Sequence, residues 1–314
     1  MTSHVPALEI SVVTPSFNQG RYLSATIESV LAQEGDFSLD YLVIDGGSTD
    51  DSVEIIREYE ARVKAGVWRP CRFRWVSEKD RGQTDAILKG FARATGEVVA
   101  WLNSDDTYLP GALATAAAYF GRDPGLGLLY GKSRFIDEHG REIGAYPTQP
   151  FDADRLATFN FIAQPSTFFR ARTLADAGGL ATELHYAMDY DLWIRMTRRS
   201  TPRYVPQYLS TFRLHDESKT MSVAHALANQ KETLEVVERH YGWSPLNRVF
   251  SYAYQLVRSR IPTRPVPLAM LTVPVAVAEY LRRNRGVRLA DMRLVNPSNL
   301  RKLFVPPGEL YKDY

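Results

Sequence analysis

Val98-Val99-Ala100-Trp101-Leu102-Asn103-Ser104-Asp105-Asp106 is the stretch of sequence that decides the fold. Its first five residues form a continuous apolar run, which is typical of a strand that helices cover on both faces of a parallel sheet. Two adjacent carboxylates follow almost at once. Because open α/β sheets bind ligands at the carboxyl ends of their strands, this order of residues predicts a polar site at the edge of a buried sheet.

The chain on the N-terminal side of this stretch repeats the same pattern. We expect strands at 10–14, 41–44, 73–76 and 98–102, and helices at 22–33, 52–65 and 84–94. This alternation predicts a doubly wound, mainly parallel α/β sheet. Polar clusters follow the first three strands at 14–18, 45–50 and 77–80. All four clusters are therefore expected at one edge of the sheet.

Beyond Gly111 the pattern becomes less regular and predicts an α+β half. We expect a helix to about 120, extended segments at 128–135 and 166–170, and a helix at 189–199. Past residue 242, arginines stand among apolar helical patterns with few acids, which favours a helical C-terminal extension. The chain is therefore divided into 1–242, with halves 1–110 and 111–242, and an extension at 243–314.

Composition narrows the function classes. The 314 residues are 24% charged and 45% hydrophobic, with a formal net charge of +2, so the chain is globular and nucleic acid is not its expected partner. A single cysteine, Cys71, excludes an internal disulfide and a four-thiolate zinc site. Residues 1–9 lack the pattern of a secretory signal, so we expect a cytoplasmic protein. The apolar stretch 265–281 contains three prolines, which argues against a simple membrane-spanning helix.

Asp105 and Asp106 are the first candidates for chemistry. Two carboxylates this close need a counter-charge, and a hard divalent cation such as Mg²⁺ or Mn²⁺ binds oxygen ligands of this kind. An Asp-Asp pair is also found in solvated turns, where the first residue caps the next helix. The residues alone leave both readings open.

Asp45 ends the second expected strand, before Gly46-Gly47-Ser48-Thr49-Asp50. The glycines allow close backbone approach, and Ser48, Thr49 or Asp50 can cap the following helix. Capping explains Asp50 better than Asp45. A carboxylate at the strand end points into the crevice, where it can accept hydrogen bonds from a base or from ribose hydroxyls.

Asp189 and Asp191 stand two residues apart at the expected start of a helix, so their side chains point in different directions. We expect one to be structural and the other to face the cleft as a general base for an acceptor hydroxyl. His215, after an extended segment, is more often a structural hydrogen-bonding residue than a ligand when taken alone.

Together, four motifs resemble those of the family 2 glycosyltransferases, which have the GT-A fold. The motifs are Val12-Val13-Thr14-Pro15-Ser16-Phe17-Asn18, Ile44-Asp45-Gly46-Gly47-Ser48-Thr49-Asp50, Asn103-Ser104-Asp105-Asp106 and Met188-Asp189-Tyr190-Asp191-Leu192-Trp193. The resemblance extends from about Ile10 to Ser218 and includes Arg213-Leu214-His215-x-x-Ser218 near its end. It makes residues 1–110 the nucleotide-binding half and residues 111–242 the acceptor half of a catalytic domain.

The resemblance implies inverting, metal-dependent transfer from a nucleoside diphosphate sugar, with uridine diphosphate sugars as the first choice, to a glycan or lipid-linked acceptor. Mg²⁺ or Mn²⁺ would be the cofactor, with Asp106 as direct ligand, Asp105 beside it, and His215 on the metal or the diphosphate. Asp189 matches the catalytic base, and Asp191 is the second candidate. The nucleotide-sugar pocket would be lined by Thr14, Pro15, Ser16, Asn18, Asp45, Gln83, Asp85 and Asp105.

Two positions depart from the family's pattern. The second acid of the Asp-Asp-Gly-Ser string is Gly46 here, and the arginine common in the helix after the third strand is Ile87. Lys79, Arg81, Gln83 or Asp85 are expected to serve that pocket instead.

Two other functions remain as alternatives. A sugar-nucleotide pyrophosphorylase shares a nucleotide-binding sheet, but it carries a glycine-rich basic loop where this chain has Thr14-Pro15-Ser16-Phe17-Asn18. A metal-dependent nucleotide-sugar-binding module or inactive scaffold would bind a donor without turning it over. For the extension, we weigh peripheral contact with the inner face of an anionic membrane against packing on the catalytic domain or contact between copies in a homo-oligomer.

Overall fold

The computed structural model describes residues 8–215, 223–260 and 265–285. Its N-terminal half alternates strands and helices as the sequence predicts. The elements are β1 (Glu9–Ser16), α1 (Gly20–Leu31), β2 (Ser38–Asp45), α2 (Ser52–Lys64), β3 (Arg72–Ser77), α3 (Gln83–Phe91) and β4 (Val98–Trp101). Each lies within a few residues of its predicted range, because apolar periodicity is strong throughout this half.

The second half is less regular, again as expected. Its elements are β5 (Thr107–Tyr108), α4 (Ala112–Arg122), β6 (Leu128–Ile136), β7 (Glu142–Ala145), α5 (Ala153–Thr158), the 3₁₀ helix η1 (Gln164–Ser166), β8 (Thr167–Arg170), α6 (Ala171–Asp176), α7 (Met188–Thr197) and β9 (Arg203–Arg213). The short elements β5, β7, α5 and α6 carry no strong periodic pattern, and the sequence did not predict them separately.

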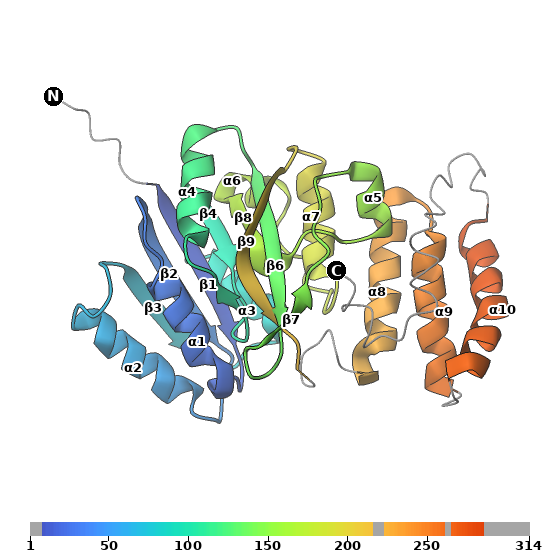
Figure 1. Ribbon diagram of the computed structural model, residues 1–314, viewed down its shortest axis with the longest axis horizontal. Coiled ribbons are helices and arrows are strands. Elements are labelled where there is room, and N and C mark those ends of the chain that lie inside the picture. Colours follow the sequence, from blue (N-terminus) through green and yellow to red (C-terminus); the bar gives the residue numbers. More distant parts are fainter. Residues whose placement is uncertain (1–7, 216–222, 261–264, 286–314) are drawn as a thin grey trace.

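One sheet joins both halves in the order β3-β2-β1-β4-β8-β6-β9-β5, with β7 added to β6 (Figure 1). The first four strands in that order are parallel to one another. β8 then pairs antiparallel with β4 and β6, while β6 and β9 are parallel. The predicted mainly parallel α/β sheet is therefore confirmed, and each antiparallel pair among the described strands includes at least one strand of the second half.

The core lies in two apolar layers, one on each face of the sheet. Val12 and Ala100 face one layer with Ile27 of α1, and Val13 and Trp101 face the other. The second layer includes a stacked pair, Trp101 on β4 and Trp193 on α7, whose ring centroids are 5.4 Å apart. Burial on both faces explains why the β4 sequence is apolar without alternation.

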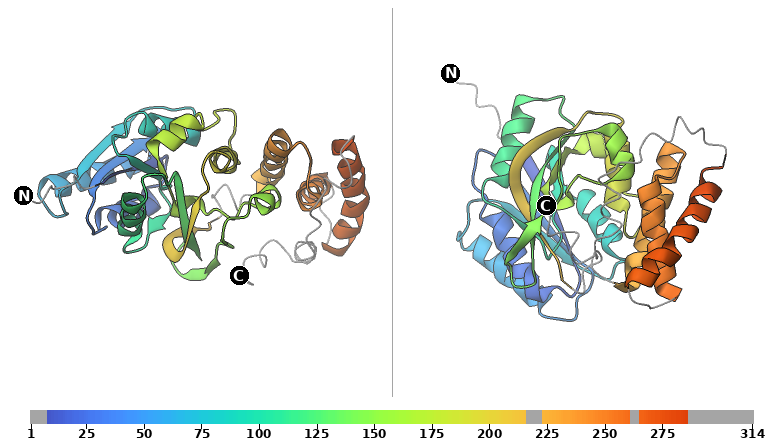
Figure 2. Two further views of the ribbon diagram at one scale, coloured as in Figure 1. Left: turned by 90° about the horizontal axis from the view of Figure 1, so that it is seen from above. Right: turned by 45° about the vertical axis from the view of Figure 1, so that its right-hand side comes forward.

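Three long helices, α8 (Val223–Tyr241), α9 (Leu246–Arg260) and α10 (Pro265–Arg283), stand side by side at one end of the molecule (Figures 1 and 2). α8 lies nearest the sheet, and its Val236 and Val237 belong to the core layer of α7. The predicted boundary at 242 falls in the turn at Gly242, where φ is +75°. In the described ranges, no helix is long and apolar enough to cross a membrane. Ser218 and residues 286–314 of the predicted extension lie outside those ranges.

Candidate active site

The carboxyl ends of the parallel strands form one edge, where the predicted polar clusters meet. Ser16 at the end of β1 is opposite Asp45 at the end of β2, and Asp45 is opposite Ser77 at the end of β3. β4 joins the same edge, since Val13 pairs with Trp101. Residues far apart in the sequence therefore stand in one row, as the fold predicts.

Asp45 is fully buried and its carboxylate is already engaged within the protein. Its Oδ2 accepts hydrogen bonds from Ser77 Oγ at 2.7 Å and from the backbone N–H groups of Gly47 and Ser48 at 3.1 and 3.0 Å. Its Oδ1 accepts one from Ser48 Oγ at 2.5 Å. Asp45 thus fixes the loop after β2, a role that the sequence analysis did not assign to it.

The loop after β1 is held against the loop after β2 by Asn18, which adopts the left-handed conformation with φ +51°. Its backbone N–H donates to Ser48 Oγ at 2.8 Å, and its side-chain oxygen accepts from Thr49 N at 2.8 Å. Thr14 is fully buried, with its hydroxyl 3.0 Å from that of Tyr41. Among these predicted pocket residues, Thr14 therefore offers only its backbone to a ligand.

Ser16 differs from its neighbours because its hydroxyl is orphaned. The residue is 4% exposed, and within the described ranges its Oγ has no hydrogen-bond partner. A buried hydroxyl without a partner costs folding free energy unless a ligand or water satisfies it. Together with Pro15, which pairs with Ile44 in the sheet, Ser16 stands at the predicted nucleotide site.

Gly46 occupies the position at which the resemblance leads us to expect a second acid. A side chain there would meet the carboxylate of Asp80, since a Cβ built on Gly46 lies 2.7 Å from Asp80 Oδ2. Asp80 Oδ1 also accepts from Gly82 N at 2.8 Å, which shapes the loop before α3. The loop after β3 therefore supplies a carboxylate beside the position where the second strand lacks one.

Asp105 and Asp106 are held apart by different partners. Asp106 is 2% exposed, and its Oδ1 accepts from the backbone N–H of Arg213 at 2.9 Å. The Asp105 side chain is 21% exposed, with its Oδ2 3.1 Å from His215 Nε2. Arg213 also donates from Nε to the Asp105 carbonyl at 2.9 Å. The end of β9 thus organises the acidic loop that follows β4.

The electrostatics of the pair follow from its burial. Desolvation, and then the negative charge of Asp105, hold the pKa of Asp106 well above the usual value for an aspartate. Throughout the described ranges, no group of three or more His, Cys, Asp or Glu side chains is arranged to hold a metal ion. Asp105 and His215 nevertheless place one carboxylate oxygen and one imidazole nitrogen side by side.

The N-terminus of α3 connects this loop with α7. Gln83 Nε2 donates to Asn103 Oδ1 at 2.7 Å, two residues before Asp105. The hydroxyl of the next residue, Thr84, lies 2.9 Å from Met188 Sδ, one residue before Asp189. Asn103 and Met188 therefore flank one helix end, so the acidic loop and the start of α7 both lie against the N-terminus of α3.

Asp85, another predicted donor contact, takes part in ion pairs. Arg81 Nη2 lies 2.8 Å from its Oδ1, and Lys89 Nζ lies 3.6 Å from its Oδ2. The hydrogen bonds from Arg81 and the nearby cations lower the pKa of Asp85. In this structure, Asp85 therefore forms ion pairs on the surface of α3.

Asp189 is half-buried in the first turn of α7, where its Oδ1 accepts from Tyr190 N at 2.7 Å. Burial raises its pKa to about 6, against hydrogen bonds to its carboxylate that lower it. A carboxylate with a pKa near 6 is ionised at neutral pH and is more basic than an ordinary aspartate. Both properties suit a general base.

Asp191 faces the other way, toward α8. It is 1% exposed, and its Oδ2 accepts from Arg195 Nε and Nη2 at 2.8 and 2.6 Å. Its Oδ1 lies 2.7 Å from His240 Nε2. Although burial opposes it, this set of partners lowers the pKa of Asp191. As predicted, the side chains of Asp189 and Asp191 point in different directions. Asp191 joins α7 to α8.

Glu232 of α8 caps the start of α7. Its carboxylate accepts from three consecutive backbone N–H groups, at 3.0 Å from His185 and at 2.6 Å from both Tyr186 and Ala187. Its negative charge also contributes to the raised pKa of Asp189. No motif in the sequence marks Glu232, because a capping residue supplied by another helix has no fixed spacing from the helix that it caps.

Comparison with known proteins begins with the family model described as Glycosyl transferase family 2, which matches residues 11–174. A curated glycosyltransferase of Nostoc sp., itself uncharacterized, is 33% identical over 142 residues, which are 45% of this chain and 42% of that protein. Escherichia coli chondroitin synthase is 26% identical over 249 residues, which are 76% of this chain and 35% of the synthase. The chain thus spans less than half the length of both relatives.

Solved structures give the same fold at low identity. TarS of S. aureus (residues 1–349) in complex with UDP has a TM-score of 0.55 and 16% identity, over 88% of this chain and 89% of that one. A mannosyltransferase from Pyrobaculum calidifontis in complex with GDP-Man and Mn²⁺ has a TM-score of 0.60 and 16% identity, over 98% and 84%. These likenesses confirm the predicted GT-A type of sheet.

Proposed function

The chain belongs to glycosyl transferase family 2 and is a glycosyltransferase, and from this premise we propose that it transfers a sugar with inversion from a nucleoside diphosphate sugar to an acceptor hydroxyl. Uridine diphosphate sugars are our first choice of donor, and a glycan or a lipid-linked sugar is our choice of acceptor. TarS was solved with UDP, which agrees with that choice of donor.

The observation that carries this proposal is the double contact at the start of α3. Gln83 reaches Asn103 beside the acidic loop, and Thr84 reaches Met188 beside Asp189. A donor held at the acidic loop and a base on α7 would therefore border one space. Single displacement requires this arrangement, because the base and the leaving group act on opposite sides of the anomeric carbon.

In the reaction that we propose, Asp189 accepts the proton of the acceptor hydroxyl as the hydroxyl oxygen bonds to the anomeric carbon. The bond from that carbon to the nucleoside diphosphate breaks, and the diphosphate leaves with the electron pair. Glu232 acts through α7, since it fixes the turn that carries Asp189. Asp191 is not proposed as a base, because Arg195 and His240 bind its carboxylate.

For the donor pocket, we propose direct contact with Ser16, whose buried hydroxyl has no partner in the described ranges. Asn18 and Asp45 would shape the pocket by fixing the loops after β1 and β2. Asp80 would supply the carboxylate that Gly46 lacks. Gln83 would approach the donor from the N-terminus of α3. Asp85 would not contact the donor, because it is paired with Arg81.

For the metal, we propose Asp105 and His215 as the ligands. They form an adjacent oxygen and nitrogen pair, which suits Mg²⁺ or Mn²⁺ when diphosphate oxygens and water complete the coordination. Such an ion would neutralise charge on the leaving diphosphate. Our sequence-based choice of Asp106 as direct ligand is replaced here, because the buried carboxylate of Asp106 binds the β9 backbone and supports Asp105 from behind.

The test is a panel of sugar nucleotides incubated with the protein and Mg²⁺ or Mn²⁺, with release of nucleoside diphosphate as the readout. A transferase is expected to hydrolyse its donor slowly without acceptor, and EDTA is expected to stop it. Titration calorimetry with nucleoside diphosphates separates the alternatives. Binding without turnover indicates a module or scaffold, and formation of pyrophosphate from a nucleoside triphosphate and a sugar phosphate indicates a pyrophosphorylase.

A further inference from the structure

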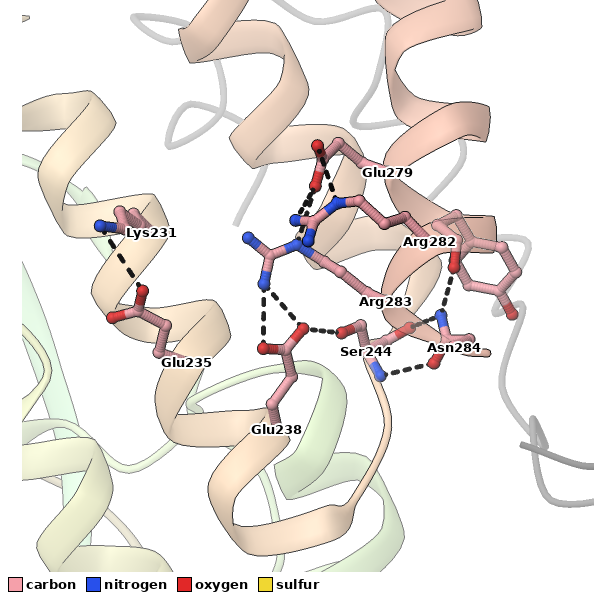
Figure 3. A network of polar contacts seen from close by, with 9 residues as sticks. Lys231, Glu235, Glu238, Ser244, Glu279, Arg282, Arg283 and Asn284 are labelled. Carbon is pink, nitrogen blue, oxygen red and sulfur yellow. Dashed lines mark hydrogen bonds and ion pairs between the residues drawn. The ribbon is translucent and has the colours of Figure 1, made fainter. Parts of the chain in front are cut away.

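The inner face of α10 is fixed to the neighbouring helices by polar contacts (Figure 3). Arg283 Nη1 lies 2.8 Å from Glu238 Oε1 on α8, and its Nε lies 3.0 Å from Glu279 Oε2 on α10. Asn284 accepts from Ser244 N at 2.8 Å. Thr272 and Ala276 are buried on the same side. These contacts set the rotation of α10 about its own axis.

The opposite face of α10 is apolar and exposed. Leu271, Val277 and Leu281 are 43%, 50% and 64% exposed, and at 100° per residue they point away from Ala276 and Arg283. Pro274 and Ala278 lie among them and are exposed as well. Exposed leucine and valine side chains gathered on one face of a helix indicate an interaction surface.

Arginines stand at both ends of this apolar face. α9 ends at Arg260 and α10 begins at Pro265, so Arg258 and Arg260 lie near the start of α10. Arg282 and Arg285 lie at its other end, and both are exposed. An apolar face flanked by arginines is typical of a helix that lies in the interface of a membrane, where the basic groups meet lipid phosphates.

The positive and negative charges of the chain are divided unevenly between the C-terminal extension and the rest of the sequence. Residues 243–314 contain 12 lysines and arginines and 4 acids, a net charge of +8. Residues 1–242 contain the other 26 basic and 32 acidic residues, a net charge of −6. The overall charge of +2 hides this asymmetry. In the part of the extension that the structure describes, residues 243–260 and 265–285, there are six arginines and one acid, Glu279. A net positive charge on α9 and α10 favours an anionic surface as their partner.

We propose that the outer face of α10 docks on an anionic lipid surface, with Leu271, Val277 and Leu281 entering the interface and Arg260 and Arg285 contacting phosphates. A second copy fits less well, because two segments of +8 repel each other and Pro274 interrupts the helical seam. A nucleic acid would leave the apolar side chains exposed. The link to a lipid-linked acceptor rests on the proposed function, but docking itself needs neither donor nor acceptor.

The experiment is co-sedimentation of the full-length protein with vesicles of phosphatidylcholine alone or with added phosphatidylglycerol, at low and high salt. We expect binding to the anionic vesicles only, and less of it at high salt, because salt screens the attraction. The variant Val277→Glu/Leu281→Glu is expected to lose binding to anionic vesicles. Arg285→Gln is expected to weaken it about fivefold.

Matched controls come from β7 and α4, outside the three C-terminal helices. Ile143 on β7 is 44% exposed, so Ile143→Glu changes an exposed apolar residue outside α10, and Arg122→Gln removes an exposed arginine of α4. Both are expected to bind vesicles like the wild type, and all four variants are expected to keep donor hydrolysis in solution.

Equal binding by wild type and Val277→Glu/Leu281→Glu, or no binding by the wild type, would overturn the proposal. Loss of a wild-type dimer in that double variant, seen by light scattering, would assign the face to a second copy instead.

Discussion

The molecule carries two pairs of aspartates, Asp105 with Asp106 after β4 and Asp189 with Asp191 at the start of α7. In each pair one member is almost fully buried and bound to the protein, Asp106 by the β9 backbone and Asp191 by Arg195 and His240. The other member is partly exposed, Asp105 beside His215 and Asp189 on the first turn of its helix. In both pairs, the partners and the burial distinguish the acid that we propose to be structural from the acid that we propose for the chemistry.

The largest expected effect separates Asp189 from Asp191. Asp189→Asn removes the proposed base, and we expect turnover to fall on the order of 10²–10⁴-fold with little change in donor binding. Asp191→Asn is the matched control and is expected to keep most turnover at a temperature where it is folded. Steady-state transfer rates and calorimetric donor affinities measure both. An inactive Asp191→Asn protein that binds donor normally would reverse the assignment.

The next prediction compares Asp105 with Asp106. Asp105→Asn is expected to raise the metal concentration needed for half-maximal donor hydrolysis by roughly 10–100-fold or more, because an amide is a poor ligand for a hard cation. Asp106→Asn keeps an oxygen that can accept from Arg213 N, so a smaller change is expected. Mn²⁺ titrations of donor hydrolysis give the two values. A larger shift for Asp106→Asn would restore Asp106 as the direct ligand.

For Asp189 and Asp191, we expect the effects on stability to have the opposite order from the effects on turnover. Asp191→Asn removes a buried carboxylate from Arg195 and His240, and we expect a loss of roughly 1–3 kcal/mol in the free energy of unfolding. Asp189→Asn removes a charge that burial disfavours, so its stability at neutral pH should equal or exceed that of the wild type. Thermal or urea unfolding of the two variants measures this. Equal destabilisation of both would show that Asp189 is structural as well.

The smallest expected effect concerns pH. A base must be ionised, and the pKa of Asp189 is raised to about 6, so turnover is expected to fall as the pH drops through about 6. Glu232→Gln removes a negative charge that favours protonated Asp189, so it should move this acid limb to lower pH. Profiles of transfer rate against pH for the two proteins test the shift. An unchanged limb would mean that Glu232 acts by capping α7 alone.

Sequence reasoning works best here where periodicity and strand ends decide the structure. The parallel half and its row of Ser16, Asp45 and Ser77 follow from apolar runs and the direction of the strands. The residues that hold the acidic motifs cannot be predicted in this way. Arg213, His240 and Glu232 come from other elements, and no pattern in the sequence near the aspartates shows how those elements pack. Asn103 could have been chosen from its motif, since it directly follows the buried strand.

The acidic loop after β4 is held by residues that are synthesised much later than the loop itself. Asp106 binds the backbone of Arg213, 107 residues later, and Asp105 meets His215, 110 residues later. During synthesis, Asp105 and Asp106 therefore leave the ribosome long before β9 does. We expect a nascent chain that ends before Arg203 to contain the predicted nucleotide-binding half without a formed metal site. Metal-dependent binding of a fluorescent nucleoside diphosphate to stalled chains of increasing length should therefore appear only after residue 215 has emerged.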